Sequence, residues 1–190
     1  FNITGMGTAV PPPNNTFYNG VLASFEAFPS VPRIDTSSPA MAVRGQSLPV
    51  YTYMLGATET RVGTSGVYAN PGGTLLTGAS LLGAVLEGGT LTFPHYSVPG
   101  ATAGTRFDQF PGAATITNGS VIAYKGNYTD PSDGIGRTGV FYRDVLASGG
   151  TSPTYEIASS NTVIPNPPPG GTTKFGSTAP PSAASGHSTG

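Results

Sequence analysis

Side chains that could carry out acid–base or nucleophilic chemistry are scarce in this chain. Its 190 residues include no cysteine and two histidines, and only 9% of them are charged. The absence of cysteine excludes disulfides, thiolate metal ligands and a cysteine nucleophile. His187 lies in a tail rich in Pro, Ser and Gly, which leaves His95 as the candidate base. A serine triad would also need an acid and an exposed nucleophile, and the sequence has no Gly-x-Ser-x-Gly turn. We therefore expect His95 to be a structural or surface residue.

A pair of carboxylates in one cleft could instead hydrolyse a glycosidic bond. The candidate acids are Glu26, Glu59, Glu87, Asp108 and Glu156. Glu26 and Asp108 occupy equivalent positions of an internal repeat, which favours a structural role such as a hydrogen bond at a strand end. We predict no catalytic residue, and we do not expect the protein to be an enzyme.

The segment Asp130-Pro131-Ser132-Asp133-Gly134 places two carboxylates in one loop, and oxygen ligands of this kind suit Ca²⁺. The spacing differs from that of an EF-hand, and no acidic residue follows nearby to complete a coordination shell. A turn is the simpler interpretation. Gly88-Gly89 and Gly149-Gly150 are not followed by Lys-Ser or Lys-Thr, as a phosphate-binding loop would require. The sequence thus predicts no metal and no cofactor.

Four Asn-x-Ser/Thr sequons could accept an N-linked glycan, and they begin at Asn2, Asn14, Asn118 and Asn127. Such sites are used on surface loops of secreted proteins. We expect turns at Asn118 and Asn127, where a glycan would be accessible. The alternative is that these asparagines are ordinary turn residues.

The composition narrows the class of partner. The formal net charge is -1, so the chain has no basic surface for nucleic acid or for anionic lipid. No apolar run reaches the ~18 residues that a membrane-spanning helix needs. A surface of Ser, Thr, Asn and Gly with few charges is poorly protected against association, which predicts a protein that assembles or carries sugar. The chain begins at Phe1 rather than Met, so we expect a processed protein that has lost a signal peptide, or else a trimmed boundary. The expected location is extracellular or at the cell surface.

Short β-type runs alternate with Gly- and Pro-containing turns over residues 16–164, which favours an antiparallel all-β fold. Asn118-Gly119 between two such runs is a strong hairpin signal. The segment Thr77–Leu86 could form a helix, although two glycines weaken it. The expected strands are Phe17–Phe28, Met41–Arg44, Val50–Leu55, Gly66–Ala69, Thr74–Leu76, Thr90–Phe93, Ala114–Thr117, Val121–Lys125, Gly139–Arg143 and Thr154–Ala158.

Three motifs occur twice in the same order, at an offset of roughly 73 to 82 residues. Order is rarely kept by chance over three motifs, so we expect two related units whose apolar faces pack on one another. The pairs are Phe25-Glu26-Ala27-Phe28-Pro29 with Phe107-Asp108-Gln109-Phe110-Pro111, Met41-Ala42-Val43-Arg44-Gly45 with Ile122-Ala123-Tyr124-Lys125-Gly126, and Ser65-Gly66-Val67-Tyr68 with Thr138-Gly139-Val140-Phe141. Two phenylalanines three residues apart point to opposite faces of a regular strand, so a bulge or burial on both faces is required.

The Pro-rich tail repeats the junction that precedes the second unit. Val98-Pro99-Gly100 comes before Gly104-Thr105-Arg106-Phe107, and Ile164-Pro165 comes before Thr172-Thr173-Lys174-Phe175. We therefore expect a third unit to begin there. The predicted organisation is an extended segment over residues 1–16, one repeat unit over 17–97, a second over 98–164, and a Pro/Gly/Ser-rich tail or start of a third unit over 165–190.

The repeat resembles the bacterial tandem-repeat proteins known as the NxxGxxAF type. The second copy carries the likeness best, in Phe107-Asp108-Gln109-Phe110, Ile116-Thr117-Asn118-Gly119, Ile122-Ala123-Tyr124-Lys125-Gly126 and Gly139-Val140-Phe141. The first copy has Asp35-Thr36-Ser37-Ser38-Pro39 in place of the Asn-Gly turn. The resemblance implies an exported, surface-associated, propeller-like β protein, and it implies no catalytic residues.

Together these observations predict an all-β, antiparallel, internally repeated and propeller-like fold, with two tandem β-sandwich modules as the alternative. We expect a non-enzymatic extracellular structural protein that associates with itself through its extended N-terminal or C-terminal segment, as a glycosylated filament or surface-layer subunit. A carbohydrate-binding or adhesion module that uses exposed Tyr and Phe is the second hypothesis. A hydrolase acting on glycans is the third.

Overall fold

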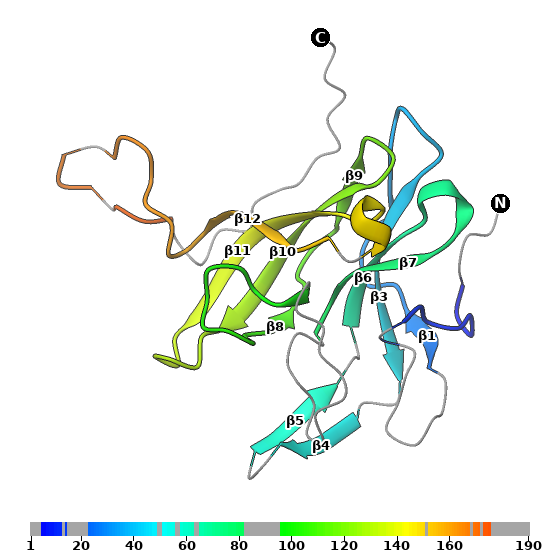
Figure 1. The fold of residues 1–190 in the computed structure, drawn as a ribbon, viewed down its shortest axis with the longest axis horizontal. Helices are drawn as coiled ribbons and strands as arrows, with labels where there is room; N and C mark the ends of the chain where they lie inside the picture. The colour runs from blue at the N-terminus through cyan, green and yellow to red at the C-terminus, as the bar shows by residue number, and fades with distance from the viewer. Residues whose placement is uncertain are drawn as a thin grey trace.

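The computed structural model describes residues 5–12, 14, 23–48, 51–55, 58–62, 65–81, 96–150, 152–167, 169–171 and 173–175. Within these residues the fold is all-β and antiparallel, as the sequence predicts, with short 3₁₀ turns. The strands form two five-stranded sheets and one separate two-stranded hairpin (Figure 1). None of the described strands closes a sheet into a barrel or a propeller ring.

The first sheet has the strand order β1-β3-β6-β7, and β2 pairs with the start of β3. Its strands are β1 (Ser24–Ala27), β2 (Arg33–Ile34), β3 (Met41–Leu48), β6 (Ser65–Ala69) and β7 (Leu76–Ser80). The predicted Asn70-Pro71-Gly72-Gly73 turn joins β6 to β7. Between β3 and β6, β4 (Tyr51–Leu55) and β5 (Thr58–Val62) pair with each other.

The second sheet repeats this plan strand for strand. Its order is β8-β10-β11-β12, and β9 pairs with the start of β10. Its strands are β8 (Phe107–Gln109), β9 (Thr115–Thr117), β10 (Val121–Thr129), β11 (Gly136–Asp144) and β12 (Tyr155–Ser159). Asn118 and Gly119 turn β9 into β10, and both have positive φ, as a tight hairpin requires. The hairpin predicted there is confirmed.

A bulge at the same position of β1 and β8 explains the spacing of the phenylalanines. The pairing register shifts around Glu26 in β1 and around Asp108 in β8. The extra residue brings Phe28 back beside Phe25, with ring centroids 5.0 Å apart, and the equivalent rings of the second sheet are 5.2 Å apart. Of the two expected explanations, a bulge or burial on both faces, the structure shows the bulge, and the two acids are the exposed bulge residues.

Glycines in the neighbouring strands leave room for these rings. Gly45 faces Gly66 across β3 and β6, and Gly126 holds the equivalent place in the second sheet. A Cβ on Gly45 would lie 2.5 Å from the ring of Phe25, and a Cβ on Gly126 would lie 2.5 Å from the ring of Phe107. In each sheet an aromatic ring thus supplies the packing that the strand glycines lack.

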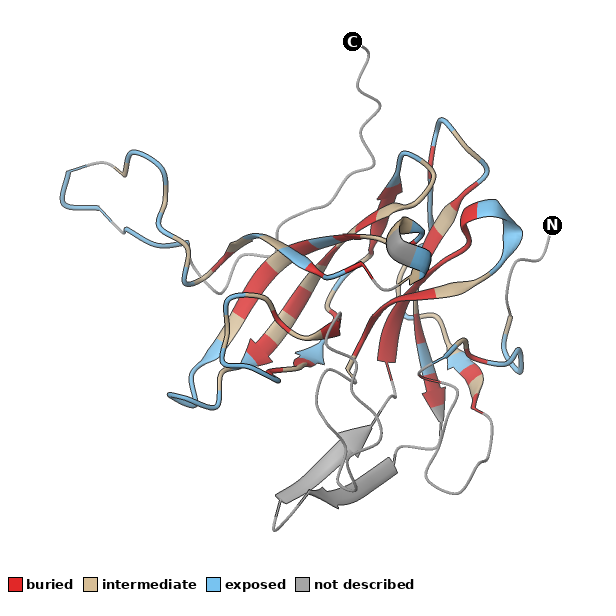
Figure 2. Ribbon diagram, viewed as in Figure 1, coloured by how far each residue is buried: buried red, intermediate tan, exposed pale blue. Residues whose placement is uncertain are grey.

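The two sheets share one hydrophobic core, whose buried residues are spread over both of them (Figure 2). The first sheet contributes mainly small side chains such as Ala42, Ala69 and Ala79, and the second contributes larger ones. A Cβ on Gly78 would collide with Cδ1 of Ile122, so the isoleucine fills the space above that glycine. A second cluster lies on the opposite face of the first sheet and consists of Val10, Ala23, Phe25, Val43 and Tyr68.

Asp35 ties the turn ends of the two units together. Its carboxylate accepts hydrogen bonds from the backbone N–H of Ser37 (2.9 Å) and from the backbone N–H of Gly119 (2.6 Å). These two N–H donors lower the pKa of Asp35 to about 2, and the hydrogen bond from Ser37 contributes most. The loop that stands in place of the Asn-Gly turn in the first unit therefore binds the Asn-Gly turn of the second.

Several elements differ from the sequence-based expectation. The helix predicted over Thr77–Leu86 is wrong, because residues 76–80 form β7 and pair with β6, while residues 82–86 lie outside the described part. Strands β10 and β11 extend beyond their predicted ends, and β2 and β5 were not expected. The predicted strand Thr90–Phe93 lies outside the described residues.

Candidate functional site

The outer face of the second sheet carries exposed apolar side chains. Register pairing puts on this face Ala123, Lys125, Val140, Tyr142, Tyr155 and Ala158, with Ile157 at a bulge beside them. Tyr142 is 38% exposed, Tyr155 46% and Ile157 57%. The rings of Tyr142 and Tyr155 stack with their centroids 5.2 Å apart. An exposed apolar surface with aromatic side chains is typical of a binding site for protein or carbohydrate.

The equivalent face of the first sheet is buried. There the matching pairs include Ala42, Ala69 and Ala79, each of them at most 2% exposed. This face shares its core with Ile122 and Tyr124, which lie on the side of the second sheet opposite to its outer face. The two sheets therefore contact each other through non-equivalent faces, in a head-to-tail arrangement.

Two positions of the outer face differ in size from their counterparts. The first sheet has Ala69 and Gly78 where the second sheet has Tyr142 and Ile157. In the first sheet the small residues admit the side chain of Ile122. In the second sheet the larger side chains project outward, so the outer face presents knobs rather than hollows.

Arg143 is the largest fully buried side chain among the described residues, at 1% exposed. It donates hydrogen bonds to four backbone carbonyls, those of Thr77 (3.2 Å), Gly78 (2.9 Å), Ser152 (2.7 Å) and Gly150. Its guanidinium also lies over the ring of Tyr96, 4.8 Å from the ring centroid. Carbonyl oxygens and an aromatic ring thus stabilise the charge, and two of the carbonyls belong to β7 of the other sheet.

Sequence reasoning missed Arg143. The only signal is its place two residues after Phe141, where the first unit has Asn70 two residues after Tyr68. Both side chains make hydrogen bonds at the end of an equivalent strand, since Asn70 accepts one from the backbone N–H of Met41 (2.9 Å). A polar residue at this repeat position therefore indicates a structural bond.

A shallow pocket of about 380 Å³ lies where β8, β10 and β11 meet. It is lined by Asp108, Gln109, Asn127, Tyr128, Thr129, Gly136, Arg137 and Thr138. Oδ1 of Asn127 and Oγ1 of Thr138 are buried there without a hydrogen-bond partner within the described residues. Asp108, which accepts a hydrogen bond from Thr129 (2.9 Å), is the one carboxylate of the lining. The pocket offers hydrogen bonds to water or a small polar molecule rather than a pair of acids.

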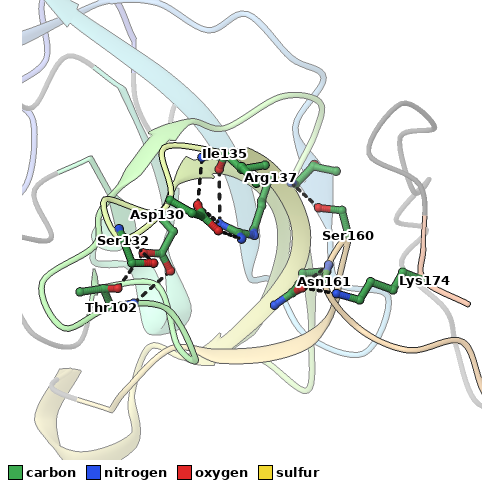
Figure 3. Close-up of polar contacts among 11 residues, drawn as sticks. Thr102, Asp130, Ser132, Ile135, Arg137, Ser160, Asn161 and Lys174 are labelled. Atoms are coloured by element: carbon green, nitrogen blue, oxygen red, sulfur yellow. Dashed lines mark hydrogen bonds and ion pairs between the residues drawn. The ribbon is translucent and has the colours of Figure 1, made fainter.

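Asp130 holds together the loop between β10 and β11 (Figure 3). Its carboxylate accepts hydrogen bonds from the hydroxyl of Thr102 (2.6 Å) and from the backbone N–H (3.0 Å) and hydroxyl (2.8 Å) of Ser132. These donors, the Thr102 hydroxyl first, hold the pKa of Asp130 below its usual value. Through Thr102 the loop is also joined to the segment that precedes β8. The role of the Asp130 carboxylate is therefore structural.

Asp133 also stabilises the loop between β10 and β11. It accepts a hydrogen bond from the backbone N–H of Ile135 (2.9 Å) and forms an ion pair with Arg137, which lowers its pKa. The turn predicted for this segment is confirmed. In the part of the chain that the structure describes, no group of three His, Cys, Asp or Glu side chains could hold a metal ion.

The candidate catalytic acids lie on different elements. Glu26 is the bulge residue of the first sheet, and Asp108 is the bulge residue of the second. Glu156 of β12 accepts a hydrogen bond from the hydroxyl of Thr162 (2.9 Å). The side chain of Glu59, and residues 87 and 95, lie outside the described part of the chain.

The sequon asparagines have different environments. Asn118 is an exposed turn residue, whereas Asn14 is 1% exposed and donates a hydrogen bond to the Tyr68 hydroxyl (2.8 Å). The turn predicted at Asn127 is wrong, because this residue lies within β10 and pairs on both sides. Asn2 lies outside the described residues. Glycosylation at the four sites stays a prediction, and of the three sequon asparagines that the structure describes Asn118 is the exposed one.

The same backbone junction precedes each sheet and recurs after β12. The N–H of Val10 donates to Ala23 O (2.9 Å), that of Val98 to Thr105 O (2.8 Å), and that of Ile164 to Thr173 O (2.8 Å). Each acceptor stands two residues before a phenylalanine, and these are Phe25, Phe107 and Phe175. The first two rings are buried, whereas the third is 42% exposed. The tail thus has the local structure that leads into a sheet, and residues 5–12 lie against the chain's own first sheet.

Comparison of the chain with protein-family models, with curated proteins and with solved structures finds no match to any of them. Among the described residues, no helix has the length and apolar character needed to cross a lipid bilayer.

Proposed function

We propose that this chain is a non-enzymatic structural protein of the cell exterior that associates with itself by stacking repeated β sheets. The observation that carries the proposal is the head-to-tail packing inside the chain. One sheet face of the first unit is covered by the second unit, while the equivalent face of the second unit is open. Heterologous contacts of this kind continue into open assemblies unless the rotation between units closes a ring.

The extracellular assignment and the glycosylation rest on composition and on the sequons. Few charges and an exposed sequon at Asn118 suit a surface that carries sugar. The propeller-like arrangement and the relation to NxxGxxAF-type repeats belong to the same proposal. They are supported by the repeated strand plan, since propeller blades also stack through non-equivalent faces.

Association through the sheet face is preferred to exchange of the N-terminal segment. Val10 and Asn14 are buried against the chain's own first sheet, so donation of this segment to a neighbour would first require its release. The outer face needs no such rearrangement.

The test is sedimentation velocity and negative-stain electron microscopy of the purified chain over a range of concentrations. We expect sedimentation coefficients that rise with concentration and particles longer than one subunit. A single monomeric species at every concentration would contradict the proposal.

Carbohydrate binding is the second candidate function, and the stacked Tyr142 and Tyr155 favour it. Exposed aromatic rings can hold the apolar face of a sugar. A glycan array that retains the wild-type chain but not Tyr155→Ala would support this alternative. An array without signal would count against it.

A further inference from the structure

The chain contains one complete example of how two of its sheets pack. The first sheet offers a face of small residues, and Ile122 of the second sheet enters it above Gly78. The same contact is tied by Arg143 to carbonyls of β7 and by Gly119 to Asp35. The covered face of the first sheet is therefore occupied by another sheet of the same repeat, and a sheet of this kind is the expected partner of an equivalent face.

The outer face of the second sheet is that equivalent surface. Ala123, Val140 and Ala158 correspond by register to Ala42, Val67 and Ala79, all of which are buried in the first sheet. On the outer face the same positions remain partly exposed. Tyr142 and Ile157 stand where the first sheet has Ala69 and Gly78, so this face cannot admit a side chain as Gly78 admits Ile122, and the contact there is made by projecting apolar side chains instead.

Lys125 is the one cation among the residues of the outer face, and it does not prevent a partner from burying this face. Lys125 occupies the position that Arg44 has in the first sheet. Arg44 is half-buried there, and desolvation lowers its pKa. A long basic side chain can lay its methylene groups on the sheet and keep its charge at the rim.

The local structure that leads into each sheet recurs after β12. The hydrogen bond from Ile164 to Thr173, like those at the two earlier junctions, follows directly after β12. Phe175 stands where a third sheet would receive the ring that Phe25 and Phe107 provide in the first two.

We infer that the outer face of the second sheet docks the first sheet of a second copy of this chain, and so continues the head-to-tail stack from one molecule to the next. In the contact within one chain, the second sheet uses the face that carries Ile122. The second copy would use the equivalent face of its first sheet, which carries Met41, the residue that matches Ile122 in the repeat. This inference rests on the proposed function, and it names the surface and the polarity of the contact.

The first experiment compares Ile157→Lys with Ile135→Lys by sedimentation velocity. Ile157 is 57% exposed on the outer face, and Ile135 is 56% exposed in the loop between β10 and β11, so the two substitutions are matched in chemistry and exposure. We expect Ile157→Lys to weaken association by about tenfold or more, because the variant loses the apolar surface that the contact would bury and adds a second cation to the face that already holds Lys125, and Ile135→Lys to leave it unchanged. Circular dichroism establishes that both variants are folded.

The second experiment tests polarity with Met41→Lys. In a head-to-tail stack this variant and Ile157→Lys each fail to polymerise, but their mixture forms dimers through the one intact pair of faces. If two outer faces met each other, Met41→Lys would assemble normally, and that result would overturn the inference.

The outcomes separate the inference from the proposed function. A monomeric wild-type chain contradicts both. A wild-type chain that assembles, together with an Ile157→Lys variant that assembles equally well, overturns the inference alone. Retention of the wild type on a glycan array, with assembly unaffected by Ile157→Lys, identifies the outer face as a carbohydrate site and also overturns it.

Discussion

Gly126 shows how single residues encode the repeat. It lies in β10 beneath the ring of Phe107, and Gly45 lies in β3 beneath the ring of Phe25. Glycine is usually unfavourable within a strand because it offers no side chain to pack. Here the missing side chain is the requirement, since the aromatic ring occupies its place.

We predict that Gly126→Ala lowers the free energy of unfolding by about 1–3 kcal/mol, the usual cost of overpacking a core. The added methyl group would lie 2.5 Å from the Phe107 ring and 3.3 Å from the Phe141 ring. Gly136→Ala is the matched control, because the position is in β11, lacks a positive φ, and a Cβ added there would meet no atom within 4 Å. Urea denaturation measures both. Equal effects of the two substitutions would refute this account of the repeat.

At the scale of elements, the loop between β2 and β3 and the turn between β9 and β10 form one connection. The carboxylate of Asp35 organises its own loop through Ser37 and reaches the backbone of Gly119. One unit thus supplies an acceptor for a turn of the other, which the sequence of either turn alone does not predict.

We predict that this connection makes stability depend on pH. The pKa of Asp35 is lowered to about 2 in the folded chain, whereas an unfolded aspartate titrates near ~3.9. The stabilisation is therefore complete above about pH 4 and is lost as the pH falls through about 2. The stability difference between the wild type and Asp35→Asn, measured by urea midpoints, should be largest at about pH 6 and shrink between about pH 4 and 2. Glu26→Gln, at an exposed acid of the same sheet, is the control. A difference for Asp35→Asn that stays constant over this range would contradict the prediction.

At the scale of the whole molecule, the shared core and Arg143 make the two sheets one cooperative unit. The buried guanidinium bonds to β7 of the first sheet and to the segment before β12 of the second. Two independent tandem modules would not share such a residue.

We predict that the wild type unfolds in a single calorimetric transition and that Arg143→Met lowers its unfolding free energy by about 3 kcal/mol or more, because the carbonyls it leaves remain buried and unpaired. Arg143→Lys keeps the charge but has fewer donors, so a smaller loss is expected. Separate transitions for the two sheets in the wild type would contradict this view.

Much of the fold was predictable from local patterns. The Asn118-Gly119 turn and the bulge in the Phe-x-x-Phe strands followed from turn chemistry and from the period of a strand. Strand β7 was not, because Gly78 and Ala79 have weak strand character, and the strand is held by pairing with β6 and by the contact of Gly78 with Ile122.

The candidate site was less accessible to sequence reasoning. The carbohydrate-binding hypothesis named exposed Tyr and Phe in general, and nothing in the sequence singled out Tyr142 and Tyr155, which form the exposed stacked pair. Their exposure depends on which face of the second sheet remains uncovered. That is a property of the packing between sheets, and neither strand alone indicates it.

The contiguity of each sheet has a consequence for how such a molecule can arise. Among the described strands, all those of the first sheet lie within residues 24–80, all those of the second lie within residues 107–159, and none of them crosses from one sheet to the other. A single in-frame duplication of one stretch of gene therefore adds a sheet that already has both of its packing surfaces. The contact between sheets then needs no redesign for a new copy, and exchanges such as Tyr142 and Ile157 where the first sheet has Ala69 and Gly78 can specialise the outer face while the interface between the sheets keeps its small residues.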